Sequence, residues 1–147
     1  MPENLIFDVQ KESGRLLINF SSTLHSIDSV AEEVKVLMTE AGLGEYSFGV
    51  RIVLREGLTN AVRHGNKSDP QKLVRFELSI QGDTLTMTIE DQGDGFDWET
   101  VKNTCCEHED GPPLDHGRGF PIIDEYFDGY KYNKKGNVLI LEKDIST

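Results

Sequence analysis

The sequence predicts an α+β fold: a two-layer sandwich with helices on one face of a mixed, mostly antiparallel sheet. Two observations favour this class. Helical hydrophobic patterns follow one another in the first half of the chain, while paired, alternating segments typical of strand hairpins precede and follow them. Helices and antiparallel strands are thus partly segregated. The 147 residues are enough for one domain with a proper core, and we expect a single domain over residues 1–147.

Hydrophobic period and turn residues place each element in order. In the first half we expect a hairpin with strands at 5–9 and 15–20, a helix from 26 or 28 to 42, and a helix over 46–64. In the second half we expect a hairpin with strands at 74–80 and 85–89, a long connection at about 92–119, a short helix at 120–127, and a hairpin with strands at 130–132 and 138–141.

The helix over 46–64 carries the first candidate site. Glu56, Asn60 and His64 are spaced four apart, so they stack along one line of the helix, which flanks its apolar stripe. A carboxylate, an amide and an imidazole on the border of the core are expected to face a cleft. Gly57 keeps the helix thin there, and Gly65 supplies a helix stop.

Two glycine clusters complete the candidate site. The first, Asp91–Asp97, follows a predicted strand, and the second, His116–Phe120, opens the last predicted helix. Glycines before a helix leave backbone N–H groups free for an anion, so the second cluster is a candidate phosphate site. Asn60 offers a neutral oxygen suited to Mg²⁺, and Glu56, one turn away, can orient or deprotonate an attacking hydroxyl. Asp91 can accept a hydrogen bond from an adenine amino group.

Composition excludes several function classes. The net charge of −11 disfavours non-specific binding to nucleic acid. No apolar run is long enough to span a membrane, and no signal peptide is visible. The two cysteines, Cys105 and Cys106, are adjacent and form no disulfide framework, so a reduced, cytoplasmic protein is the simplest interpretation.

Alternative interpretations apply to these residues and their neighbours. His64 is expected to form structural hydrogen bonds rather than to act as a catalyst, and Arg118 suits either a phosphate contact or the surface equally well. The segment from Asp91 fails as a calcium loop, because Gly93 and Gly95 stand where oxygen ligands are needed. Cysteines 105 and 106 with histidines 108 and 116 lack a standard zinc spacing.

In this order and spacing, the three clusters resemble the ATP-site motifs of the GHKL ATPases, a superfamily that includes DNA gyrase and histidine kinases. The pattern is closest to that of the bacterial anti-sigma-factor serine-protein kinases. Its E-x-x-x-N-A-x-x-H, D-x-G-x-G-F-D and G-x-G-F/L-x-I-I motifs are met at Glu56–His64, Asp91–Asp97 and Gly117–Ile123. The resemblance covers about residues 15–143.

The resemblance implies a Bergerat ATP-binding fold with ATP and Mg²⁺ as cofactors. Asn60 would bind Mg²⁺, Glu56 would be the general base, and Asp91 would hold adenine. The residues expected to contact the nucleotide are Asn60, His64, Asp91, Gly93, Gly95, Phe96, Gly117, Arg118, Gly119 and Phe120. The chain departs from the family at Pro121 and at residues 135–137, where Lys-Gly-Asn replaces the common Gly-Gly-Thr. The second departure replaces the threonine that usually makes a water-mediated adenine contact in this family.

The implied function is that of an anti-sigma regulator, an ATP-dependent protein serine kinase that binds a sigma factor and phosphorylates an anti-anti-sigma antagonist. A nucleotide-binding interaction module without phosphotransfer and an ATP hydrolase are the alternatives. The hydrolases of the superfamily usually carry a further domain, for which this chain has no room, and no phospho-acceptor helix pair precedes the domain as in a histidine kinase. A homodimer is a further expectation. Residues at about 100–117 are expected to form a nucleotide-responsive lid.

Overall fold

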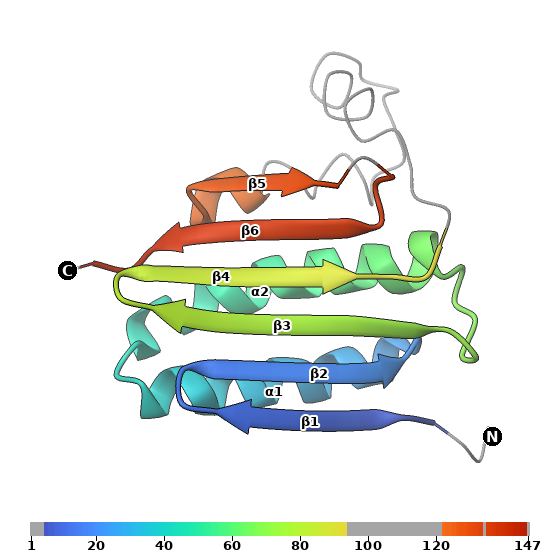
Figure 1. The fold of residues 1–147 in the computed structure, drawn as a ribbon, viewed down its shortest axis with the longest axis horizontal. Helices are drawn as coiled ribbons and strands as arrows, with labels where there is room; N and C mark the ends of the chain where they lie inside the picture. Colours follow the sequence, from blue (N-terminus) through green and yellow to red (C-terminus); the bar gives the residue numbers. More distant parts are fainter. Residues whose placement is uncertain (1–4, 94–121, 134, 147) are drawn as a thin grey trace.

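The computed structural model describes residues 5–93, 122–133 and 135–146, and the structural statements below refer to these (Figure 1). Six strands form one layer in the order β1-β2-β3-β4-β6-β5, and helices α1 and α2 cover one face of it (Figure 1). Each of the five strand pairings is antiparallel. The predicted α+β sandwich is therefore confirmed.

The elements follow one another in the predicted order. They are β1 (Phe7–Glu12), β2 (Arg15–Ser21), α1 (Leu24–Glu40), α2 (Gly44–Asn60), the π-helix η1 (Ala61–Gly65), β3 (Leu73–Gln81), β4 (Thr84–Glu90), β5 (Gly129–Tyr132) and β6 (Val138–Asp144). Residues 122–126 form a short helix within the predicted span of 120–127.

Several predicted boundaries were wrong, and three of them have a clear physical reason. β1 ends at Glu12 rather than at residue 9, because it pairs with β2 along its whole length although nearly all of its side chains are exposed. α1 begins at Leu24, two residues before the earliest predicted start, because Thr23 caps it and accepts a hydrogen bond from the Ser26 backbone N–H at 3.3 Å. β6 extends to Asp144, which pairs with the first residue of β4.

Buried side chains from alternate strand positions meet the buried faces of α1 and α2 in one core. α2 lies so close to the sheet that a Cβ added at Gly57 would stand 2.6 Å from Ile89 Cδ1. The prediction that Gly57 keeps the helix thin is confirmed. The close approach brings the last turns of α2 against the ends of β4 and β6.

The predicted helix over 46–64 changes geometry at its end. After Asn60 it widens into η1, and the Asn66 backbone N–H donates to Ala61 O, five residues earlier, at 2.8 Å. Single π-turns inside α-helices occur frequently at functional sites. The wider turn changes the angle between successive side chains over Ala61–Gly65.

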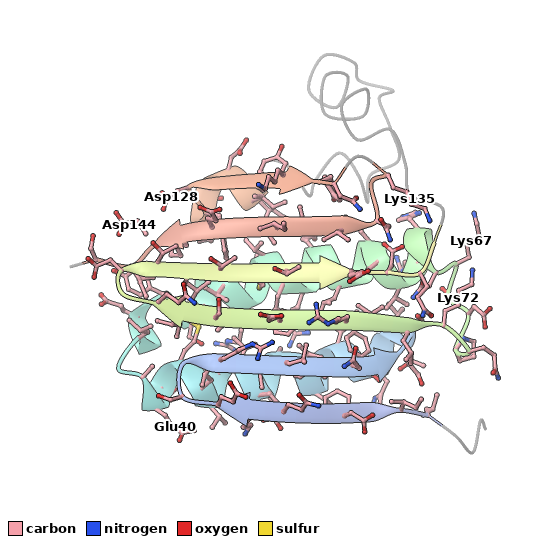
Figure 2. The ribbon with its side chains drawn as sticks, in the orientation of Figure 1. Glu40, Lys67, Lys72, Asp128, Lys135 and Asp144 are labelled. Carbon is pink, nitrogen blue, oxygen red and sulfur yellow. The ribbon has the colours of Figure 1, made fainter. Side chains whose placement is uncertain are left out.

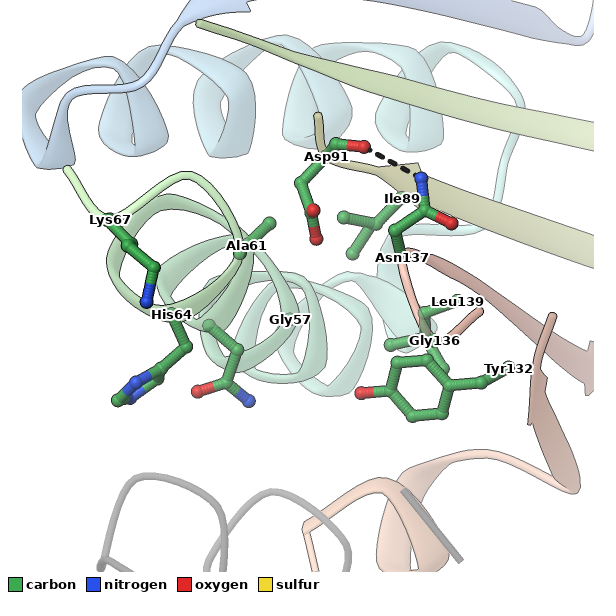
Figure 3. A pocket seen from close by; sticks show the side chains of 12 residues that line it. Gly57, Ala61, His64, Lys67, Ile89, Asp91, Tyr132, Gly136, Asn137 and Leu139 are labelled. Atoms are coloured by element: carbon green, nitrogen blue, oxygen red, sulfur yellow. Dashed lines mark hydrogen bonds between the residues drawn. The ribbon is translucent and has the colours of Figure 1, made fainter. Parts of the chain in front are cut away.

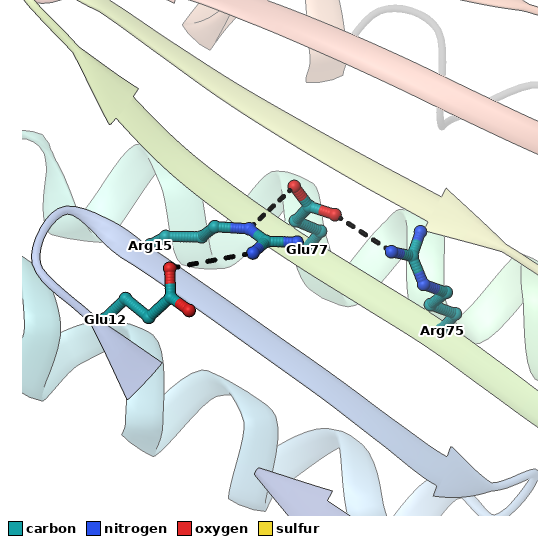
Figure 4. Close-up of polar contacts among 4 residues, drawn as sticks. All are labelled: Glu12, Arg15, Arg75 and Glu77. Carbon is teal, nitrogen blue, oxygen red and sulfur yellow. Dashed lines mark hydrogen bonds and ion pairs between the residues drawn. The ribbon is translucent and has the colours of Figure 1, made fainter. Parts of the chain in front are cut away.

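The other face of the sheet is polar. On it Glu77 accepts from Arg15 Nε and from Arg75 Nη2, each at 3.2 Å, and Arg15 also lies near Glu12 (Figure 4). Partly exposed pairs of this kind contribute little stability, so they define a solvated face rather than a second core. The candidate site therefore lies on the helix side.

Candidate functional site

A cavity of about 260 Å³ opens where α2 turns into η1, where β4 ends and where β6 begins (Figure 3). It is lined by Gly57, Asn60, Ala61, His64, Gly65, Lys67, Ile89, Asp91, Tyr132, Gly136, Asn137 and Leu139. Aliphatic groups and an aromatic ring form much of the wall, and a few polar groups converge on it. This combination suits a flat, largely apolar ligand with one polar edge.

Asp91 supplies that polar edge. Its carboxylate points into the cavity (Figure 3), the residue is 9% exposed, and Oδ1 accepts a hydrogen bond from the Gly93 backbone N–H at 2.8 Å. Loss of solvent around the buried carboxyl raises its pKa, an effect that the Gly93 N–H bond opposes. The carboxylate is therefore a buried acceptor, ready for a donor on a ligand.

Two glycines make room for this carboxylate. A Cβ at Gly65 would lie 2.3 Å from Asp91 Oδ2, and a Cβ at Gly93 would lie 1.9 Å from the backbone oxygen of Gly65. Gly65 does end the helical segment as predicted, but its φ is not in the left-handed range. Its lack of a side chain therefore serves close contact rather than an unusual backbone conformation.

Asn60 contributes a second polar group to the cavity. Its Oδ1 is buried, and within the described part of the chain no hydrogen bond reaches it. An unsatisfied buried acceptor costs about 1–3 kcal/mol, so an uncompensated oxygen in a cavity indicates a ligand. A neutral amide oxygen is a ligand that Mg²⁺ accepts, and the site therefore fits the predicted ion.

Two of the three side chains in the predicted line contribute to the cavity. Asn60 and His64 both line the cavity, and His64 is exposed at its mouth. Glu56 is half-buried and is not among the described residues that line the cavity. The cavity thus brings together Asn60, His64 and Asp91 and leaves Glu56 outside its lining.

Several cavity residues were not predicted. Tyr132 comes from β5, where burial, together with nearby Tyr130 and Asp91, raises its pKa and keeps the phenol protonated. Lys67 comes from the loop after η1, where it and Ser68 have φ values of 53° and 58°. The sequence signalled a loop there, but it carried no signal for the side chain that turns toward the cavity.

Six predicted site residues lie outside the described residues. They are Gly95, Phe96, Gly117, Arg118, Gly119 and Phe120. The predicted lid at about 100–117 and the cysteines at 105 and 106 lie outside them as well.

Three lysines lie at the end of the sheet where the cavity opens (Figure 2). Figure 2 shows Lys67, Lys72 and Lys135 at the cavity end of the sheet and Asp128 and Asp144 at the opposite end. These lysines favour the approach of an anion in spite of the net charge of −11.

An antiparallel α+β sandwich whose cavity joins a buried carboxylate, an unsatisfied amide oxygen and nearby lysines defines a nucleotide-binding class of domain. The chain belongs to the family of histidine kinase-like ATPase domains, whose model matches residues 20–143. Membership in this family implies the use of ATP.

Curated relatives agree with this family. The chain is 30% identical over 103 residues to an anti-sigma F factor of Clostridium perfringens (strain SM101 / Type A), which covers 67% of this chain and 72% of that protein. It is 31% identical over 90 residues to an anti-sigma F factor of Anoxybacillus flavithermus, with 60% of each chain covered. It is 28% identical over 95 residues to the serine-protein kinase RsbW of Staphylococcus epidermidis, with 61% of this chain and 60% of that protein covered. Among the described residues, no helix is long and apolar enough to cross a membrane.

Proposed function

We propose that this protein is an ATP-dependent protein serine kinase that acts as an anti-sigma regulator. It binds a sigma factor and phosphorylates a serine of an anti-anti-sigma antagonist. Relatives named anti-sigma F factor and serine-protein kinase support both halves of the proposal, regulation and phosphotransfer.

One observation carries the nucleotide part of the proposal: the unsatisfied Asn60 Oδ1 and the buried Asp91 carboxylate belong to one cavity. Asp91 would accept a hydrogen bond from the amino group of adenine, and Ala61, Ile89 and Leu139 would give the base apolar contacts. Asn60 would hold Mg²⁺. When bound, Mg²⁺ supplies charge neutralisation for the phosphates.

Phosphotransfer needs a group that orients the serine hydroxyl of the antagonist. Glu56 precedes Asn60 by one helical turn, so it lies next to the metal-binding amide along α2. We assign Glu56 the role of general base, which accepts the hydroxyl proton as the oxygen attacks.

A second candidate is a nucleotide-binding regulatory module that transfers no phosphate. The position of Glu56 outside the described lining of the cavity favours it. In such a protein ATP changes the shape of a partner-binding surface, and no base is required.

One experiment separates the two candidates. The protein is incubated with γ-labelled Mg-ATP and each anti-anti-sigma-like protein of its own genome, and label on serine is followed over time. The kinase proposal expects transfer by the parent protein and a loss of about 10²-fold or more in Glu56→Gln, with Mg-ATP affinity retained. Binding of ATP without transfer to any of these proteins would favour the regulatory module.

A further inference from the structure

The peptide bond between Asp91 and Gln92 has both of its polar groups bonded to asparagine side chains. Asn137 Nδ2 donates to the backbone oxygen of Asp91 at 3.0 Å, and the Gln92 backbone N–H donates to Asn66 Oδ1 at 2.7 Å. These two atoms belong to one rigid peptide plane. We call Asn66 and Asn137 the asparagine clamp.

Asn66 holds its end of the clamp firmly. The residue is fully buried, and its Nδ2 donates to Ser22 Oγ at 2.6 Å and to the backbone oxygen of Leu73 at 2.9 Å. With Oδ1 on Gln92, the side-chain amide uses both hydrogens and its oxygen, so any rotation breaks a buried hydrogen bond. Asn66 thereby connects the segment before α1 and the start of β3 to the segment after β4.

Asn137 holds the other end of the clamp through hydrogen bonds that lie nearer the surface. Its Oδ1 accepts from Asn133 Nδ2 at 2.8 Å, and its backbone N–H donates to Asn133 Oδ1 at 3.0 Å. The Asp91 backbone N–H also donates to the backbone oxygen of Asn137 at 3.0 Å. Asp91 is therefore joined to Asn137 through both its N–H and its C=O groups.

The clamp fixes the backbone that carries the cavity carboxylate. Holding the peptide plane after Asp91 sets the ψ angle of Asp91 and the φ angle of Gln92. That backbone places the Gly93 N–H at 2.8 Å from Asp91 Oδ1 and the other carboxylate oxygen against Gly65. Recognition by a single carboxylate needs it held to about 0.5 Å and 10–20°.

We propose that Asn66 and Asn137 are positioning residues that set the purine selectivity of the cavity by holding Asp91 in place. The proposal rests on the proposed nucleotide function and adds a determinant of its specificity. Adenine presents an amino group to the carboxylate, whereas guanine presents a carbonyl oxygen at the equivalent position. A fixed carboxylate accepts the first and repels the second, and a loosened one can turn away from the carbonyl.

The test measures the affinities for Mg-ADP and Mg-GDP by calorimetry, because diphosphates allow no transfer of a γ-phosphate. Asn137→Ala removes one end of the clamp. Asn137→Asp keeps the shape and the acceptor for Asn133 but places an oxygen against the Asp91 carbonyl. Asn66→Ala removes the other end. Asn19→Ala, on the polar face of β2, is the matched control because it removes an amide that is not among the described residues lining the cavity.

Each clamp variant is expected to lower the ratio of ADP to GDP affinity about three- to tenfold, the range expected for a lost hydrogen bond. Asn19→Ala keeps the parental ratio. The ratio isolates selectivity, since added charge or lost stability changes both affinities alike. Should Asn66→Ala fail to fold, the two Asn137 variants decide the matter.

Two results would contradict the proposal, and they are distinguishable. If the folded clamp variants keep the parental ratio of ADP to GDP affinity, the clamp does not set selectivity, and the proposed function is unaffected. A folded parent protein that binds no Mg-ADP overturns the proposed function and the role of the clamp with it.

Discussion

The Asp91 carboxylate lies directly against the backbone of Gly65, so closely that a Cβ at residue 65 would stand 2.3 Å from Oδ2. The contact joins the end of η1 to the end of β4. It explains why the helical segment that carries Asn60 ends in glycine at this point.

Gly65→Ala should therefore displace the carboxylate while leaving the fold intact, because an aspartate side chain can turn away more readily than a backbone can move. A hydrogen bond to a charged group is worth about 1.5–3 kcal/mol, so Mg-ADP affinity should fall about 10- to 100-fold. Calorimetry on Gly65→Ala measures this. Gly44→Ala is the matched control, since a Cβ there meets nothing within 4 Å, and equal affinities in the two variants would refute the importance of the contact.

Asp91 should also give the fold a defined pH dependence. Burial and the Glu90 charge raise the pKa of Asp91 above the usual 3.8. The Gly93 N–H, Lys135 and Lys72 lower it, but by less, so the folded state disfavours the ionised form. The destabilisation is absent below the usual value and grows as pH rises through the raised pKa. Asp91→Asn should therefore gain free energy of unfolding relative to the parent as pH rises from about 3.8, as measured by urea unfolding. A difference that is constant or shrinks with pH would contradict this assignment.

The same substitution should weaken nucleotide selectivity. An amide in place of the carboxylate is both donor and acceptor, so it tolerates the carbonyl oxygen of guanine. Competition between Mg-ADP and Mg-GDP at neutral pH measures the change. Parental preference in Asp91→Asn would show that another group recognises the base.

Replacing Asn60 should have opposite effects on the stability of the nucleotide-free protein and on Mg²⁺-dependent nucleotide binding. Asn60→Ala removes a buried oxygen that has no hydrogen-bond partner in the described part of the chain, and it also favours the helix. The nucleotide-free protein should thus be as stable as the parent or more so, by up to about 2 kcal/mol. Nucleotide binding should lose its dependence on Mg²⁺. Thermal unfolding without nucleotide and calorimetry with and without Mg²⁺ test both parts; a variant whose binding still requires Mg²⁺ would show that Asn60 is not a metal ligand.

A further contact should anchor the helix over residues 122–126. A Cβ at Gly49 would meet the Tyr126 ring at 2.6 Å, and that ring makes an edge-on contact with Phe48. Lys143 Nζ donates to the Tyr126 backbone oxygen. Gly49→Ala should cost about 1–3 kcal/mol of unfolding free energy, because overpacking outweighs its gain in helix propensity. Urea unfolding of Gly49→Ala and of the control Gly44→Ala measures this difference. Equal stability of the two variants would contradict the prediction.

Local patterns predicted the element order because hydrophobic period and turn residues are local signals. Asp91, Asn60 and Gly57 were placed near the cleft for the same reason: each is tied to a periodic helix or to a strand end. Boundaries failed where pairing or capping decided them, as at β1 and at Thr23.

The polar framework of the cavity could not be predicted in this way. Asn66 was assigned to a loop, yet its amide forms hydrogen bonds with Gln92 and Ser22, which lie 26 and 44 positions away in the chain. Asn137 was noted only as a departure from a family pattern, and its bond to Asp91 spans 46 positions. No local period encodes contacts of this length. The π-turn after Asn60 likewise gave no signal in the sequence.

The most direct test of the account is a calorimetric titration of the folded protein with ADP, with and without Mg²⁺, and with GDP in parallel. The account predicts one nucleotide per cavity, binding that requires Mg²⁺, and a clear preference for ADP over GDP. Absence of ADP binding in the presence of Mg²⁺ would contradict it.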